Sequence, residues 1–142
     1  MSKILVTYWS GTGNTEKMAE LITQGAKAKG AEVDCKNISE VGVDDALAYD
    51  VLVIGSPSMG AEVVEESEIE PFVESLSDKA KDRKIGIFGS YGWGDGEWMR
   101  NWADRMKGYG ANLLDDGLIA HETPEGDEAN ACVAWGESLA GF

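Results

Sequence analysis

The sequence is poor in the residues that build metal sites and disulfide frameworks. Its 142 residues include one histidine, His121, and two cysteines, Cys35 and Cys132, which lie far apart in the chain. Neither a disulfide framework nor a metal or catalytic site based on Cys or His is therefore expected. The simplest prediction for the two cysteines is that they are small, buried or half-buried apolar residues of a protein in a reducing compartment.

Basic residues and long apolar runs are also scarce. There are 12 Lys and Arg against 26 Asp and Glu, so the formal net charge is -14. Nucleic acids and anionic membranes attract basic groups and are poor partners for such a chain, whereas a basic protein partner is favoured. No apolar run approaches the roughly 18 residues of a membrane-spanning helix, and the apolar run within residues 1–6 is far too short for a signal peptide. We expect a cytoplasmic protein.

What the sequence does contain is a regular alternation of apolar strands and amphipathic helices. Its length fits one domain over residues 1–142, since domains cluster near about 100–150 residues. Apolar runs predict strands at 4–9, 33–38, 51–54, 85–88 and 113–120, the last with a bend at Gly117. Helical spacing predicts helices around 18–25, 44–48, 69–76, 97–107 and 129–139. Right-handed crossovers then give an α/β fold, a five-stranded parallel sheet with helices on both faces.

Three segments of unusual composition lie at the carboxyl ends of these strands, where such sheets bind ligands. The first, Ser10-Gly11-Thr12-Gly13-Asn14-Thr15, joins a strand to a helix, and its polar side chains and N–H groups can hold a phosphate. An ordinary N-capped turn is the alternative. No Lys follows as in a P-loop, and Glu16 stands where a dinucleotide fingerprint has its last glycine. This pattern fits a small phosphate ester that is bound permanently by neutral donors.

The other two segments offer surfaces for a flat ring. In Ser90-Tyr91-Gly92-Trp93-Gly94, the flanking glycines leave Trp93 without local packing, which favours stacking of a heteroaromatic ring on its indole. In residues 56–62, Met59 adds a polarizable surface and Gly60 permits backbone conformations closed to other residues. Glu62 can accept a hydrogen bond from an imide N–H of such a ring. A core tryptophan and a plain Pro-Gly loop are the alternatives.

Together these segments make the chain resemble a flavodoxin, the FMN-containing electron carrier of bacteria. The resemblance covers the whole chain and rests on Tyr8-Trp9-Ser10-Gly11-Thr12-Gly13-Asn14-Thr15-Glu16, Met59-Gly60 and Phe88-Gly89-Ser90-Tyr91-Gly92-Trp93-Gly94. Because the last strand has no long insertion, the chain is similar to the short-chain, clostridial-type members. The resemblance implies a flavodoxin-like three-layer α/β/α sandwich with strand order 2-1-3-4-5.

The resemblance also implies one tightly bound FMN. Residues 10–15 would hold the phosphate with Ser90 nearby, and Met59 and Trp93 would sandwich the isoalloxazine. Glu62 would bind N3–H, and backbone groups around Gly92 would meet the pyrimidine carbonyl. The expected FMN-binding residues are Ser10, Gly11, Thr12, Gly13, Asn14, Thr15, Pro57, Ser58, Met59, Gly60, Ala61, Glu62, Ser90, Tyr91, Gly92, Trp93 and Gly94. The chain departs from close family members at Ala61 and near Glu122, and no FMN contact is assigned to the last strand.

The implied function is a low-potential one-electron carrier, not an enzyme, that shuttles non-covalently bound FMN between semiquinone and hydroquinone. Carboxylates cluster in residues 62–70, 95–97 and 122–128, next to the flavin loops, whereas most bases precede strands. Such a negative rim would lower the second potential and attract a basic partner. We therefore expect a monomer that meets basic-faced redox proteins such as oxidoreductases, and neither nucleic acid nor membrane.

Two other protein classes share this architecture. A flavin-dependent enzyme such as a quinone reductase needs a substrate pocket over the flavin and usually extra elements or a second subunit. Here the chain is near minimal and Trp93 would cover the outer face of the ring, so only NAD(P)H-driven quinone turnover would favour that class. A response-regulator receiver needs an acidic pair after the first strand and an Asp ending the third. Those positions are Trp9-Ser10 and Gly55-Ser56, which excludes a receiver.

Overall fold

The computed structural model describes residues 2–142, so Met1, the first residue of the segment compared with a signal peptide, lies outside the described residues. The strands are β1 (Lys3–Tyr8), β2 (Glu32–Asn37), β3 (Val51–Gly55), β4 (Lys84–Tyr91), β5 (Asn112–Leu113) and β6 (Leu118–His121). The α-helices are α1 (Asn14–Ala28), α2 (Val43–Ala46), α3 (Ile69–Glu74), α4 (Glu97–Gly108) and α5 (Asp127–Ala140), and a 3₁₀ turn, η1, spans Ile38–Glu40.

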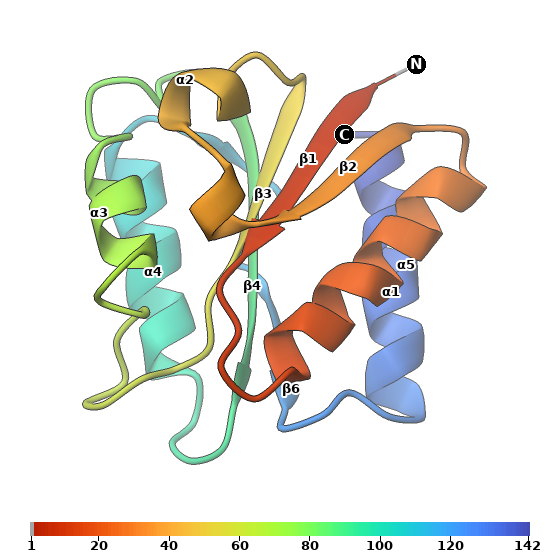
Figure 1. The fold of residues 1–142 in the computed structure, drawn as a ribbon, viewed down its shortest axis with the longest axis vertical. Helices are drawn as coiled ribbons and strands as arrows, with labels where there is room; N and C mark the ends of the chain where they lie inside the picture. Colours follow the sequence, from red (N-terminus) through yellow and green to blue (C-terminus); the bar gives the residue numbers. More distant parts are fainter. Residues whose placement is uncertain (1) are drawn as a thin grey trace.

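The strands form one parallel sheet between two layers of helices. Its strand order is β2-β1-β3-β4-β5, which confirms the order 2-1-3-4-5 expected from the resemblance. Helices α1 and α5 lie side by side on one face of the sheet, and α3 and α4 cover the other (Figure 1). The three-layer α/β/α arrangement is therefore as expected.

The last strand differs from the sequence prediction. Instead of one strand over 113–120, the structure has two, and both pair with β4 in parallel: β5 opposite Lys84 and Ile85, and β6 farther along. Between them the chain leaves the sheet in a turn, in which Asp115 Oδ1 accepts a hydrogen bond of 2.7 Å from the N–H of Gly117. Gly117 has a φ of +101°, which lies outside the range of a regular β-strand. The prediction of a single bent strand is therefore wrong, and the sheet has six strands.

Buried side chains of the sheet alternate between two hydrophobic layers. Ile4 and Val6 of β1 face the layer of α1 and α5, whereas Leu5 faces the layer of α3 and α4. Every residue of β3 is buried, as predicted for a strand that is covered on both faces. Trp102 of α4 and Trp135 of α5 fill the two layers on opposite sides of the sheet.

Helices α1 and α5 pack backbone to backbone at two glycines. A Cβ atom on Gly25 would overlap the carbonyl oxygen of Val133, and one on Gly136 would overlap the carbonyl oxygen of Ile22. Only hydrogen atoms fit between the helices at these points. This close contact fixes the position of α1, whose first residues border the site described below.

The structure shows where the two cysteines lie and whether residues 2–142 contain a group of metal ligands or a membrane-spanning helix. Cys132 is buried in α5, as expected, but Cys35 is exposed because β2 is the edge strand of the sheet, so the prediction of a buried or half-buried residue was wrong there. Within residues 2–142, no group of three or more His, Cys, Asp or Glu side chains is placed to hold a metal ion. No helix in the same range is long and apolar enough to cross a membrane.

Candidate functional site

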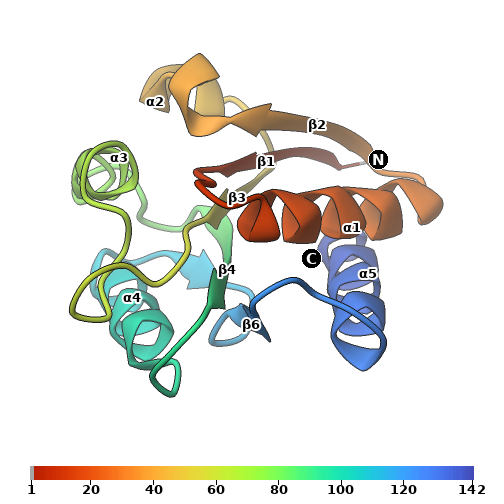
Figure 2. The same ribbon diagram turned by 60° about the horizontal axis from the view of Figure 1, so that its bottom comes forward.

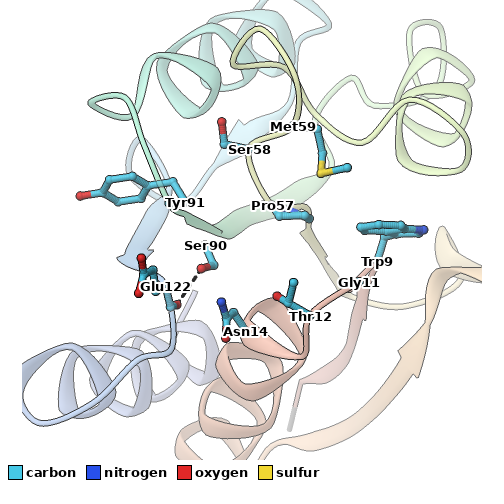
Figure 3. Close-up of a pocket in the computed structure, with 11 residues that line it drawn as sticks. Trp9, Gly11, Thr12, Asn14, Pro57, Ser58, Met59, Ser90, Tyr91 and Glu122 are labelled. Carbon is cyan, nitrogen blue, oxygen red and sulfur yellow. Dashed lines mark hydrogen bonds between the residues drawn. The ribbon is translucent and has the colours of Figure 1, made fainter.

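Three loops meet at the carboxyl end of the sheet, at the bottom of Figure 1 and toward the viewer in Figure 2. They follow β1, β3 and β4, and they are the segments singled out in the sequence. A cavity of about 290 Å³ lies between them (Figure 3). Its lining consists of Trp9, Gly11, Thr12, Asn14, Pro57, Ser58, Met59, Ser90, Tyr91, Gly92 and Glu122.

The loop after β1 is organised around the hydroxyl group of Ser10. Ser10 Oγ accepts hydrogen bonds from the backbone N–H groups of Gly13 (3.1 Å) and Glu16 (3.3 Å). Gly13 has a φ of +94°, a left-handed conformation that suits glycine, and it leads directly into α1. The N–H groups of Asn14 and Thr15 begin this helix and therefore have no acceptor within it.

These donors fit a phosphate ester. The Thr15 hydroxyl belongs to a residue that is 1% exposed, and it has no hydrogen-bond partner in the described part of the chain. The start of α1, a helix of 15 residues, adds N–H groups and a dipole that favours an anion. Residues 10–15 contain no Lys or Arg. Within residues 10–15, an anion would thus be bound by neutral donors.

The loop after β3 makes a tight turn. Met59 and Val63 exchange backbone hydrogen bonds of 2.8 and 3.0 Å across it. Within the turn, Gly60 and Glu62 both have positive φ, at +51° and +55°. The turn leaves Met59 37% exposed at the side of the cavity, where its thioether is accessible to a ligand.

Buried polar groups fasten this loop to the body of the protein. Ser56 Oγ accepts a hydrogen bond of 2.9 Å from the N–H of Glu65. The carboxylate of Glu65, a residue that is 4% exposed, accepts hydrogen bonds of 2.8–3.0 Å from the N–H groups of Ser67, Glu68 and Ile69, and another from the Ser67 hydroxyl. Burial by itself would raise the pKa of this carboxyl, but the hydrogen bonds outweigh it and hold the pKa below its ordinary value. Glu65 therefore stabilises the loop. It is not one of the exposed carboxylates that would form the negative rim around the site, which we call the acidic rim.

The loop after β4 carries an exposed tryptophan and touches the second loop. Trp93 is 59% exposed and lies outside the lining of the cavity. Its neighbour Gly94 lies against the carboxylate of Glu62, because a Cβ atom on Gly94 would overlap Glu62 Oε1. This Oε1 is buried and has no hydrogen-bond partner within residues 2–142. The buried Oε1 of Glu62 thus lies against Gly94 with no hydrogen-bond donor beside it in the described residues.

The structure places the residues expected to bind FMN in two groups. Those that line the cavity are Gly11, Thr12, Asn14, Pro57, Ser58, Met59, Ser90, Tyr91 and Gly92. Those in the same loops but outside its lining are Ser10, Gly13, Thr15, Gly60, Ala61, Glu62, Trp93 and Gly94. Ser10 and Gly13 shape the first loop, and Glu62 and Gly94 join the other two.

Two lining residues were not among the expected ones, Trp9 and Glu122. The indole ring of Trp9 lies over Gly11, where a Cβ atom would come within 3.0 Å of it. Glu122 follows β6, donates a backbone hydrogen bond of 2.8 Å to the Tyr91 carbonyl and accepts one of 2.7 Å from the Ser90 hydroxyl (Figure 3). The sequence prediction placed Trp9 in the first strand, whereas β1 ends at Tyr8 and leaves Trp9 at the start of the first loop. The family resemblance drew attention to Glu122 only as a departure from close relatives and assigned it no contact, because the break between β5 and β6 decides which residue reaches the cavity.

The acidic rim is smaller than the sequence suggests. Glu65 is buried. The carboxylate of Glu70 accepts two hydrogen bonds, of 2.7 and 2.6 Å, from the guanidinium of Arg105, which balances its charge. Asp95 forms an exposed ion pair of 3.0 Å with Arg100. The other carboxylates at this end that stay exposed include Glu66, Glu97, Glu122, Glu125 and Asp127.

Comparison with known proteins decides the family. The family described as flavodoxin matches residues 6–136. The chain belongs to the flavodoxin family. The flavodoxin of Clostridium beijerinckii is 48% identical over 135 residues, which cover 95% of this chain and 97% of that relative. The flavodoxin of Megasphaera elsdenii is 44% identical over 135 residues, and its two-electron reduced solution structure matches with a TM-score of 0.88 over 98% of this chain and 99% of that one.

Membership of this family settles the general function. Flavodoxins are electron-transfer proteins, not enzymes, and they bind FMN, so the predicted activity class and cofactor are confirmed. The one-electron cycling expected from the sequence is consistent with this membership. Flavodoxins carry electrons to redox partners, and flavodoxin-like segments also occur in larger oxidoreductases. The chain is 26% identical to part of the nitric oxide reductase of Moorella thermoacetica, of which it spans 36%.

Proposed function

We propose that the cavity between the three loops holds the FMN of this electron carrier. The observation that carries the proposal is that all three loops line one cavity, with the start of α1 on one side and Met59 on another (Figure 3). FMN, when bound, supplies the one-electron chemistry. The protein orients the cofactor, covers its ring and sets the charge around it.

In this proposal, different groups of residues contact the phosphate, the ring faces and the polar ring edge of FMN. The phosphate lies at Ser10, Gly11, Thr12, Gly13, Asn14 and Thr15, with Ser90 nearby. Met59 and Trp93 cover the two faces of the isoalloxazine, and the free Oε1 of Glu62 accepts a hydrogen bond from N3–H. Backbone groups around Gly92 meet the pyrimidine carbonyl. The remaining contacts come from Pro57, Ser58, Gly60, Ala61, Tyr91 and Gly94.

Titration of the FMN-free protein with FMN tests this placement, because ring stacking quenches flavin fluorescence. We expect Trp93→Ala to lower FMN affinity by about tenfold or more, since the ring loses a specific aromatic contact and the buried area that goes with it. Trp93→Phe should restore most of that affinity. Ile119→Ala, which removes another exposed apolar side chain, serves as the control and should bind FMN like the wild type. Wild-type affinity in Trp93→Ala would contradict the ring placement.

We also propose that redox partners dock on this end of the molecule with a basic face. In the part of the chain that the structure describes, the exposed large hydrophobic side chains are Met59, Val63, Trp93 and Ile119. Met59, Val63 and Trp93 lie on the loops after β3 and β4, and Ile119 lies in β6 close to Gly96, which ends the loop after β4. The exposed Glu97 directly follows Gly96. A partner with an apolar centre and a basic rim complements this surface. The rate of reduction of a basic cytochrome should fall as ionic strength rises, and a rate independent of salt would contradict the proposal.

We further propose that residues 1–142 act as one FMN-binding domain and as a monomer. The family match over residues 6–136 and the single sheet support the first statement. Sedimentation equilibrium over a range of protein concentrations tests the second, and a mass that rises toward twice that of the chain would contradict it. The cytoplasmic location, and the absence of nucleic-acid and membrane partners, stay predictions from composition and charge.

A further inference from the structure

A side-chain hydrogen bond joins the loop after β6 to the start of α1. The hydroxyl group of Thr123 donates to Asn14 Oδ1 at 2.6 Å, across 109 positions of sequence. Asn14 is the first residue of α1 and lines the cavity. Thr123 does not line the cavity and belongs to none of the three loops.

This bond decides which end of the Asn14 amide faces the cavity. A carboxamide has an acceptor oxygen on one side and a donor NH₂ group on the other. Because Thr123 occupies the oxygen, the nitrogen points the other way, and Figure 3 shows the amide nitrogen of Asn14 directed toward Ser90. A reversed amide would direct a partly negative oxygen at any anion bound by this loop. With no Lys or Arg in residues 10–15, the direction of neutral donors matters all the more.

We propose that Thr123 is a positioning residue for phosphate recognition. It holds the Asn14 amide so that its NH₂ group donates to the phosphate of FMN. The proposal rests on the proposed function, which places that phosphate at residues 10–15. It adds a residue from a part of the chain to which no FMN contact had been assigned.

The loop that carries Thr123 is anchored without the help of its hydroxyl group. Its neighbour Glu122 is held by hydrogen bonds to Tyr91 and from Ser90, at 2.8 and 2.7 Å, and Pro124 on the other side is buried. Thr123 itself is exposed. Replacing the hydroxyl by a methyl group, as in Thr123→Val, should therefore leave the loop in place and free only the Asn14 amide.

The test compares FMN with riboflavin, which lacks the phosphate, in fluorescence titrations of the full-length FMN-free protein. We expect Thr123→Val to weaken FMN binding about three- to tenfold, the worth of one hydrogen bond, and to change riboflavin binding less than about twofold. Thr123→Ser should restore FMN affinity, and the urea midpoint of the FMN-free protein should be unchanged. In an Asn14→Ala background, Thr123→Val should have no further effect, because the amide that it orients is gone.

Several results would overturn the proposal. Unchanged FMN affinity in Thr123→Val, an equal loss for FMN and riboflavin, or a full additional loss in the Asn14→Ala background would each show that Thr123 does not act through the phosphate donor. A wild-type protein that binds FMN no more tightly than riboflavin would instead remove the phosphate assignment at residues 10–15. Failure of the wild type to bind FMN at all would remove the proposed function itself.

Discussion

The carboxylate of Glu62 lies directly on Gly94, so that the second and third loops of the site meet at one side chain and one glycine. Gly94 has a φ of +85°, and a methyl group there would overlap Glu62 Oε1. The same oxygen has no hydrogen-bond partner within residues 2–142, which makes it the acceptor that we assign to N3–H of FMN.

Gly94→Ala should therefore displace Glu62. We expect FMN affinity to fall about tenfold or more, because a hydrogen bond to a charged acceptor is lost. Stability should fall by about 1–2 kcal/mol from the left-handed backbone alone. FMN titration and urea unfolding measure the two effects. Gly108→Ala is the matched control, since Gly108 has ordinary φ and open space around it, and a Gly94→Ala protein with FMN affinity close to that of the control would refute the expectation.

Glu65 should make stability depend on pH in the acid range. Its pKa is lower in the folded protein than the ordinary value of 4.5, so its contribution is complete above that value and is lost as pH falls through the lower, folded value. Glu65→Gln should cost about 1–3 kcal/mol of unfolding free energy at pH 7, since an amide cannot accept all these hydrogen bonds. Urea unfolding should show this difference shrinking below pH 4.5. The exposed Glu66→Gln is the control, and a Glu65→Gln deficit that is independent of pH would disprove the assignment.

The contact between α1 and α5 should be intolerant of one methyl group. Gly136→Ala would place Cβ on the carbonyl oxygen of Ile22, and the helices must separate to admit it. We expect a loss of about 1–3 kcal/mol in unfolding free energy, although alanine favours a helix more than glycine does. Gly141→Ala, near the end of the same helix, has room for its methyl group and should be neutral. Equal stability of the two variants would argue against the tight packing.

Glu122 should tune the potential of FMN through its charge. It lines the cavity, and a carboxylate at about 10 Å disfavours an added negative charge by roughly 0.4–1.7 kcal/mol, or about 20–70 mV. Glu122→Gln should raise the potential of the reduction step that adds negative charge by this order at low salt, and by less at high salt. Spectroelectrochemical titration measures it. Glu32→Gln, an exposed carboxylate at the start of β2, is the control, and equal shifts in both variants would contradict a local effect.

Much of the fold could be predicted from the sequence because hydrophobic periodicity reports burial directly. The apolar run of β3 and the helical spacing of α4 each needed only a local pattern. The division of the last strand was missed because Gly117 and Asp115 make a turn that leaves the apolar pattern on both sides intact. The exposure of Cys35 was missed because only the pairing order makes β2 an edge strand.

The site was predictable where composition is unusual and not where a role depends on distant partners. Glycine-flanked Trp93 and the polar loop after β1 are visible in the sequence itself. Glu65 looks like any member of its acidic run, and only the N–H groups that converge on it separate it from Glu66. The role that we propose for Thr123 likewise depends on Asn14, a residue at the other end of the chain.

The chain leaves the sheet between β5 and β6. The length of this connection can therefore change without a change in the shape of the cavity. Each strand is held in register by its own pairing with β4, so neither depends on how many residues connect them. Asp116, within that connection, forms an exposed ion pair of 2.5 Å with Lys107. Extra residues introduced at Asp116 would extend into solvent and leave Glu122 at its place beside the cavity. We expect that a peptide or a reporter group inserted at this position will leave the geometry of the cavity between the three loops unchanged.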